Sequence, residues 1–331
     1  YSIAHDLMQI KTQINSSVSK KSYSSTDQLK CHGVGQGAGN GGTKWTFISI
    51  PMIEVVEEVS KGCVIQLPKG SNTWEKHMLA FVDDKRHYVN GSPTQTNKQI
   101  LTDMELSVSS WNELLHFVGG ALETSKCAWY LITWTFNSTD SPVMQTTNEE
   151  FSITMNDGTK MHSTQLQPNQ PTTYLGVTSQ VDGNQTEQTN ILKHKANRIS
   201  RKLTCCHMPH YYGHIHQMCS INPKLTYPLV ASSMSNKQLN SIHRIIHPSV
   251  IASKGFNRNW PESLRYGNHK YCGLDIIDYR VEQRLRKIQL IHKLLLHPKH
   301  KILMQSIIEW YHISAGLVGQ ILVNPSSKVN Y

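Results

Sequence analysis

Two adjacent carboxylates, Asp83 and Asp84, directly follow an apolar run in the stretch "MLAFVDD". Like charges repel each other, and burying either one is costly unless a cation compensates. Strand-like segments flank the pair at 76–82 and 86–91, so we expect a β-hairpin with the pair at its tip. Two interpretations of the pair are open: a solvated surface turn, or a site for a bivalent metal ion.

The charge balance of the chain points to a class of partner. The chain has 331 residues, enough for two domains, and 33 Lys and Arg against 23 Asp and Glu give a net charge of +10. A basic protein of this size favours a polyanionic partner, and nucleic acid is the commonest one. Excess charge that serves only solubility is the alternative.

The cysteines and the hydropathy predict a compartment. Seven cysteines occur at irregular spacings in a long chain, which is not typical of a disulfide framework and indicates a reducing environment. No apolar run approaches the roughly 18 residues that a membrane-spanning helix needs. We therefore expect an intracellular protein, in the cytoplasm or nucleus, without a membrane partner.

Helical and strand patterns alternate along the chain. Helical periodicity is expected at 43–62, 98–118, 185–204 and 278–298. Pro51 lies inside the first of these helices, so a kink or a late start is possible there. Strands or hairpins are expected at 63–67, 76–82, 86–91, 128–136, 150–166 and 172–183, with loops at 68–74 and 137–150. In the last helix one side is expected to be the apolar face, formed by Val281, Leu285, Ile288, Ile291, Leu294 and Leu295.

Four short motifs, taken in order, resemble those of a known family. They are "GQGAGNGGTKW" at 35–45, "FVDD" at 81–84, "GGALETSKC" at 119–127 and "YLGV" at 174–177. Their order and spacing resemble the reverse transcriptases (RNA-directed DNA polymerases) of non-LTR, LINE-like retroelements. Later segments at 254–267, 272–278 and 282–295 resemble the region beyond the palm, so the resemblance covers nearly the whole chain.

The resemblance implies a fold and a domain organisation. It implies an α+β fold with a polymerase palm-type antiparallel sheet backed by helices, followed by a mostly helical region. Residues 1–180 would form a partial palm. Residues 181–331 would form a basic, helical region like a thumb or connection domain.

The resemblance also implies site residues and ligands. Asp83 and Asp84 would hold Mg²⁺ or Mn²⁺ for two-metal nucleotidyl transfer, and Lys126 would neutralise or protonate the leaving pyrophosphate. The loop residues implied to contact template and nucleotide are Gly35, Gln36, Gly37 and Gly39. The turn implied to support the primer is Tyr174, Leu175 and Gly176. The implied partners are an RNA template, a DNA primer and a dNTP; the oligomeric state is not implied.

Three departures from the family pattern shape the expected activity. Only 32 residues precede Gly33, and they resemble the helix after the strand that carries the first catalytic Asp, so we expect a fragment without that motif and without fingers. Gly42 stands at a position usually held by Pro. Lys85 and Arg86 follow the Asp pair and would compete with Mg²⁺. We therefore expect the chain to be inactive alone; a non-catalytic nucleic-acid-binding remnant is the alternative.

Two further groups of residues have open interpretations. The helix at 185–204 carries cations that would track phosphates in a thumb or lie on a solvated face: Lys193, Lys195, Arg198, Arg201 and Lys202. The stretch "CCHMPHYYGHIHQMC" at 205–219 contains seven Cys and His residues that are possible zinc ligands. These are Cys205, Cys206, His207, His210, His214, His216 and Cys219. Their spacing matches no familiar zinc finger, and the resemblance implies nothing there.

Overall fold

A computed structural model describes residues 41–66, 73–82, 84–155, 157–206 and 209–316. It also describes four two-residue strands near the N-terminus: β1 (Gln9–Ile10), β2 (Gln13–Ile14), β3 (Ser17–Val18) and β4 (Tyr23–Ser24). Strand β1 pairs with β4 and β2 with β3, both antiparallel. The prediction that this stretch resembles a helix is therefore wrong at these eight positions.

The chain divides into two compact units, each described here by itself. The first contains Tyr1–Gln66, Ser71–Leu131 and Asn148–Gln165, and the second contains Leu67–Gly70, Ile132–Thr147 and Leu166–Tyr331. The hairpin at 172–179, which the sequence assigned to the first domain, therefore groups with the second unit.

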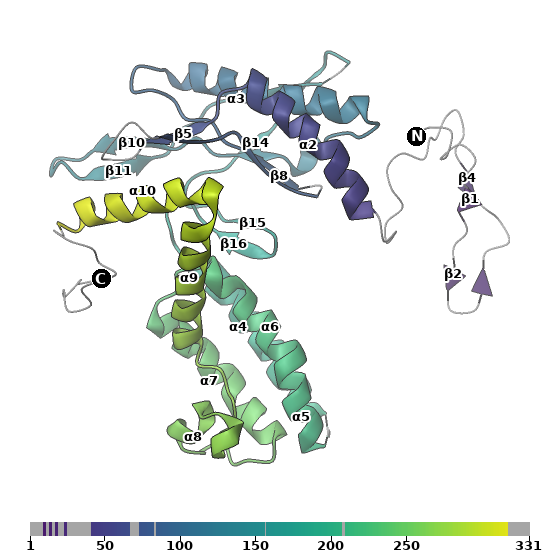
Figure 1. Cartoon of the computed structure of the whole chain (residues 1–331), viewed down its shortest axis with the longest axis vertical. Coiled ribbons are helices and arrows are strands. Elements are labelled where there is room, and N and C mark those ends of the chain that lie inside the picture. The colour runs from purple at the N-terminus through teal and green to yellow at the C-terminus, as the bar shows by residue number, and fades with distance from the viewer. Residues whose placement is uncertain are drawn as a thin grey trace. The chain divides into compact units, whose positions relative to one another are not determined.

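Besides the two short N-terminal strand pairs, two long helices and four strand pairs form the described part of the first unit (Figure 1). The helices are α2 (Gly41–Val59), α3 (Asn97–Phe117) and the short η1 (Thr124–Lys126). The strands are β5 (Cys63–Gln66), β6 (Thr73–Lys76), β7 (Met78–Phe81), β8 (Asp84–His87), β9 (Ala128–Trp129), β12 (Ser152–Thr154), β13 (Lys160–His162) and β14 (Thr164–Gln165). The β5–β6, β7–β8 and β12–β13 pairs are antiparallel, and β14–β9 is parallel.

The core of this unit explains why its helices lie where they do. Met52 and Val56 of α2 pack with Met78 of β7 and Trp111 of α3, all nearly fully buried. A second cluster consists of Trp129, Leu131, Phe151 and Ile153, against which α3 also packs. Helix α3 therefore joins both hydrophobic clusters, as its long amphipathic pattern predicts.

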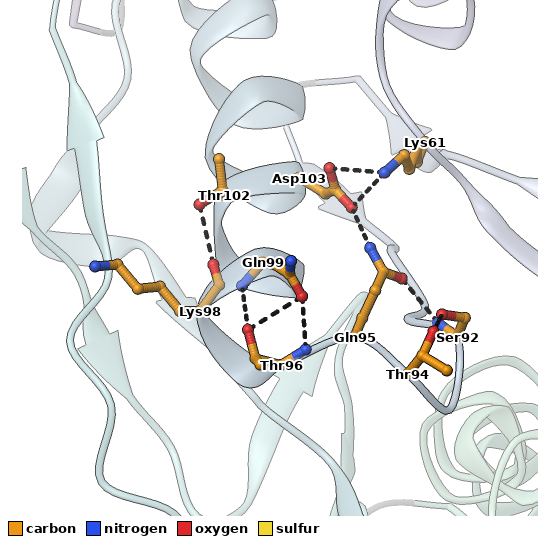
Figure 2. Close-up of polar contacts among 9 residues, drawn as sticks. All are labelled: Lys61, Ser92, Thr94, Gln95, Thr96, Lys98, Gln99, Thr102 and Asp103. Atoms are coloured by element: carbon orange, nitrogen blue, oxygen red, sulfur yellow. Dashed lines mark hydrogen bonds and ion pairs between the residues drawn. The ribbon is translucent and has the colours of Figure 1, made fainter.

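Polar contacts fix where α3 begins (Figure 2). Thr96 and Gln99 form a capping box, each side chain bonding the other's main-chain N–H. One turn further along, the Asp103 carboxylate accepts from Lys61 Nζ at 2.9 and 3.1 Å and from Gln95 Nε2 at 3.2 Å. The start of α3 is thereby held next to the connection between α2 and β5.

A side chain joins two of the strand pairs. The Asn90 amide accepts from the main-chain N–H of Val64 at 3.1 Å and donates to its carbonyl at 2.9 Å. Val64 lies in β5, and Asn90 follows β8. The described strands otherwise form two-stranded pairs, so the structure shows a mixed α+β protein with small sheets, and a single palm-type sheet stays a prediction.

The second unit is mostly helical. Its helices are α4 (Thr186–Cys205), α5 (His210–His216), the π-helical turn η2 (Gln217–Ile221), α6 (Asn222–Thr226), η3 (Tyr227–Val230), α7 (Asn236–Ser253), α8 (Glu262–Tyr266), η4 (His269–Tyr271), α9 (Tyr279–Leu296) and α10 (Pro298–Ser314). Two antiparallel hairpins accompany them, β10 (Thr133–Phe136) with β11 (Pro142–Gln145) and β15 (Thr172–Tyr174) with β16 (Val177–Ser179). Apolar residues of α4 and α7 form the centre of its core.

The first half of helix α9 packs through a different face from the one predicted, whereas Ile291, Leu294 and Leu295 of the predicted face are half-buried. Val281, Leu285 and Ile288 are 60%, 47% and 64% exposed, whereas Tyr279 and Gln283 are buried. Gln283 can be buried because its amide donates to the Met234 carbonyl at 3.0 Å and accepts from the Met234 N–H at 3.2 Å. A polar side chain that satisfies buried main-chain groups therefore faces the core in place of the apolar stripe.

Candidate active site

The predicted hairpin around the Asp pair is present. Strands β7 and β8 pair antiparallel, and Phe81 lies opposite Asp84 as the last pair before the turn. Asp84 is therefore the first residue of β8, where its carboxylate is exposed. Asp83 and the loop residues Gly35, Gln36, Gly37 and Gly39 lie outside the described residues.

The turn of this hairpin has an unusual main-chain conformation. Val82 has φ 52°, in the left-handed region that β-branched residues rarely adopt. Two side chains contact its carbonyl oxygen: Trp45 Nε1 donates to it at 2.6 Å, and Lys85 Nζ also donates to it. These bonds hold the turn in a conformation that costs energy, as occurs more often at functional sites than elsewhere.

Trp45 brings the helix after the glycine-rich loop to the Asp hairpin. It lies in the second turn of α2, which begins at Gly41, directly after the predicted template-binding loop. With a rise of about 1.5 Å per residue, the first residue of α2 lies about one helical turn from Trp45 along the axis. The chain therefore enters α2 close to the turn that carries the Asp pair.

The ammonium of Lys85 lies over two indole rings. Its Nζ is 5.3 Å from the ring centroid of Trp45 and 5.2 Å from that of Trp111, within the range of cation–π attraction. The sequence predicted that Lys85 and Arg86 would compete with a metal ion for the carboxylates. That competition stays a prediction, but one of the two cations is anchored below the turn by aromatic faces.

A half-buried histidine lies at the end of strand β8 in the same hairpin. His87 Nδ1 is 2.8 Å from Ser107 Oγ, and its ring meets the Trp111 ring edge-on at 6.5 Å. Burial, with a smaller contribution from the nearby charge of Lys85, lowers the pKa of His87 to about 4. The imidazole is therefore neutral at pH 7 and adds no third positive charge at the base of the hairpin.

The predicted primer-supporting turn is a two-residue hairpin turn in the second unit. Tyr174 pairs with Val177, and Leu175 and Gly176 both have positive φ, 49° and 76°, as a type I′ turn requires. Tyr227 Oη donates to the Leu175 carbonyl at 2.8 Å, which fixes the turn. The predicted turn is confirmed, and its role toward a primer stays a prediction.

Lys126 lies at the end of η1 and is exposed. The pKa of the neighbouring Glu123 carboxyl is lowered by hydrogen bonds from Ser125 and, less strongly, by the charge of Lys126. The predicted role of Lys126 toward pyrophosphate stays a prediction.

The basic helix has the polarity that the sequence predicted. In α4 the residues Leu192, Ala196, Ile199 and Leu203 are buried in the core. The cations lie on the other faces: Arg198, Arg201 and Lys202 are exposed, and Lys193 and Lys195 are half-buried. Helix α4 therefore presents a row of positive charge along its outer side.

Metal ligands do not gather in the described residues. Among residues 41–316, apart from the short gaps in the description, no three His, Cys, Asp or Glu side chains lie together as a metal site. In the Cys/His stretch, His210 Nδ1 is 3.2 Å from the Ser253 carbonyl and the His214 ring lies 6.0 Å from that of His269. His207 is outside the description. The zinc interpretation therefore has no support among the described residues. The search does not test the Asp pair, because only Asp84 of the pair is described.

Several site residues were not found from the sequence. Trp45 is the last residue of the motif at 35–45 but had no role assigned to it, and Trp111, His87 and Tyr227 were not singled out. The single signal that could have pointed to Trp45 was a tryptophan in the first turns of a helix that follows a glycine-rich loop. Contacts such as Trp45 to Val82, 37 positions apart, leave no local pattern.

Comparisons with known proteins identify no relative. No protein-family model matches the chain, and no curated protein matches it in sequence. None of the described helices is long and apolar enough to cross a membrane.

Proposed function

We propose that this chain is the palm and thumb-like part of an RNA-directed DNA polymerase of a LINE-like retroelement, inactive by itself. The hydrogen bond from Trp45 to the Val82 carbonyl carries the proposal, because it joins the helix after the glycine-rich loop to the Asp hairpin. A polymerase needs those two segments side by side, since one contacts the nucleotide and the other holds its metal ions.

The carboxylates at the hairpin suit a hard cation. Asp84 is exposed at the first position of β8, and Asp83 precedes it in the sequence. Carboxylate oxygens are the protein ligands that Mg²⁺ and Mn²⁺ prefer, and the ions retain waters and substrate phosphates as further ligands. Bound there, the metal ions would stabilise the charge on the transferring phosphate.

The remaining parts would position the nucleic acid. The Leu175–Gly176 turn, fixed by Tyr227, would support the primer backbone, and the outer face of α4 would contact phosphates. Gly35, Gly37 and Gly39 would let the main chain approach the template and dNTP, with Gln36 donating and accepting hydrogen bonds.

Metal binding at the hairpin tests the proposal directly. Electron paramagnetic resonance would measure Mn²⁺ binding to the chain with an RNA–DNA primer–template and a dNTP. We expect Asp83→Asn and Asp84→Asn each to weaken binding at least about tenfold, because each removes a charged ligand. Asp140→Asn is the matched control, since Asp140 lies in another exposed hairpin turn, between β10 and β11. Equal Mn²⁺ binding by wild type and both hairpin variants would refute the site.

The alternative function, a non-catalytic nucleic-acid-binding remnant, is favoured by the outer face of α4. It predicts binding that falls steeply with salt and does not depend on Mg²⁺. Arg198→Glu with Arg201→Glu should weaken binding of a primer–template at least about tenfold, whereas Lys160→Glu on the exposed strand β13 should not. Binding that requires Mg²⁺ would exclude this alternative, and no binding at low salt would exclude both.

A further inference from the structure

Three exposed tyrosines lie at one end of the helical unit. Tyr211 and Tyr212 of α5 are 72% and 57% exposed, and Tyr271 of η4 is 73% exposed. Figure 1 shows α5 at the end of the unit where α8 also lies. Aromatic side chains contribute most when covered, so three uncovered rings on short helices indicate a surface that binds something.

Close contacts hold these short helices together. Gly213 of α5 packs so tightly on α7 that a Cβ there would lie 2.5 Å from the Ser253 carbonyl oxygen. His210 Nδ1 is 3.2 Å from the same oxygen. On the neighbouring flank, the rings of His214 and His269 lie 6.0 Å apart, which places η4 beside α5. The tyrosines are therefore carried by a fixed arrangement of main chain.

Two of the tyrosines are in contact with each other, and the third has a cation beside it. Tyr211 is three residues before His214, so both are on the flank of α5 that faces η4. Its ring meets that of Tyr212 edge-on at 5.8 Å. In η4, Lys270 Nζ lies 5.8 Å from the ring centroid of Tyr271. Exposed rings and a positive charge are thus carried by two adjoining short helices.

The surrounding sequence is entirely free of carboxylates. Residues 188–261 contain no Asp or Glu and ten Lys or Arg. The ten are Lys193, Lys195, Arg198, Arg201, Lys202, Lys224, Lys237, Arg244, Lys254 and Arg258. Two carboxylates that follow this stretch have cationic neighbours: Glu262 Oε1 is 3.6 Å from Arg280 Nη2, and the charge of Asp275 acts on Lys254. A ligand of this surface must therefore be an anion that also offers flat apolar faces.

We infer that this end of the helical unit binds an unpaired nucleic-acid strand. Its bases stack on Tyr211, Tyr212 and Tyr271, and Lys270 and Arg258 contact its phosphates. Stacking of bases on aromatic side chains in a positive groove is how single strands are bound without sequence preference. A duplex is not suited, because its bases already stack on each other. The inference does not depend on the proposed polymerase function, since it involves neither metal ions nor the Asp pair.

Fluorescence anisotropy with the full chain tests the inference. The probes are labelled oligo(dT) and oligo(U) of about 12 nucleotides, and a duplex of equal length, in EDTA. We expect the single strands to bind more tightly than the duplex. Alanine at Tyr211, Tyr212 or Tyr271 should each raise the Kd at least about fivefold, whereas phenylalanine should preserve it, because stacking needs only the ring. Phe117→Ala is the control, since Phe117 of α3 is 89% exposed.

Three results would overturn the inference. They are unchanged affinity in the tyrosine-to-alanine variants, equal or tighter binding of the duplex, and displacement of the oligonucleotide by poly-glutamate of the same charge. Circular dichroism of each variant separates lost stacking from lost folding. Asp83→Asn and Asp84→Asn should not change the affinity in this assay, so failure of the polymerase proposal and failure of the strand-binding site give different results.

Discussion

The indole nitrogen of Trp45 lies 2.6 Å from the carbonyl oxygen of Val82 and donates a hydrogen bond to it, across 37 positions of the chain. This bond connects α2 to the only part of the β7–β8 hairpin whose main chain is strained, among the residues described there. The strained conformation of Val82 therefore depends on a partner from another element, and removing that partner should release it.

Trp45→Phe should loosen the hairpin while retaining an aromatic ring at this position. The loss of one hydrogen bond and part of the indole should destabilise the hairpin by about 1 to 2 kcal/mol. Hydrogen exchange followed by mass spectrometry should then show faster exchange of residues 78–87, by about fivefold or more. Trp134→Phe, which changes a 56% exposed tryptophan of β10, is the control. Unchanged exchange in the Trp45 variant would show that the bond does not hold the turn.

His87 should make the first unit sensitive to acid. Its folded-state pKa of about 4 lies below the ordinary value of 6.5, so the unfolded state takes up the proton first. Stability is therefore complete above about pH 6.5 and falls as the pH drops toward 4, by up to about 3 kcal/mol. Urea unfolding between pH 7 and 4.5 would measure this loss, and His87→Gln should reduce it. An equal pH dependence in that variant would contradict the assignment.

A stacked pair of histidines should have the same effect in the second unit. The rings of His243 and His247 lie 4.4 Å apart, and burial lowers their pKa values to about 4 and about 3. His243 Nε2 accepts from the Tyr279 N–H at 2.9 Å, and Asp278 at 3.9 Å only partly offsets the burial. Protonation therefore breaks a buried bond, and stability should fall below about pH 6.5 by about 1.4 kcal/mol per pH unit for each histidine.

The contribution of one histidine can be isolated. His247→Gln should reduce the slope of the unfolding free energy against pH by up to about 1.4 kcal/mol per pH unit, which corresponds to one proton. Urea unfolding at several pH values would measure this slope. His194→Gln, on the exposed side of α4, should leave the slope unchanged. A slope that is the same in all three proteins would mean that the buried pair does not titrate on unfolding.

Gly273→Ala should severely destabilise the second unit. A Cβ at this buried glycine would lie 1.9 Å from the carbonyl oxygen of Gly267, a main-chain atom that cannot rotate away. We expect a loss of about 3 kcal/mol or more, seen as a lower midpoint in urea. Gly183→Ala is the comparison, because that glycine has φ +81° but open space around it, so only about 1 kcal/mol should be lost.

Local patterns predicted most of the helices and the turns. The period of apolar residues at 98–118 predicted α3, which spans Asn97–Phe117. Turn residues predicted the β12–β13 and β15–β16 hairpins, since glycine adopts positive φ without strain. By contrast, β11 and the first half of β6 form where loops were expected, because four residues are too few to show a period.

The buried face of α9 and the neighbours of the Asp hairpin depend on long-range packing, which the sequence patterns did not predict. The stripe Val281, Leu285 and Ile288 has ideal helical spacing, yet Gln283 faces the core because the main chain of Met234 needs its amide. Similarly, the neighbours of the Asp pair come from α2 and α3, and no spacing rule connects Trp45 or Trp111 to Val82. Motifs were enough to propose the Asp pair as a metal site. The aromatic residues that contact the hairpin could be identified only from the structure.

The amide of Asn90 has a consequence for solubility. At Val64 it reproduces both hydrogen bonds of a neighbouring strand, so this point of β5 offers no free donor or acceptor to another molecule. Replacing Asn90 by an aliphatic residue would expose a template for strand addition, and aggregation would then begin at this edge of the protein.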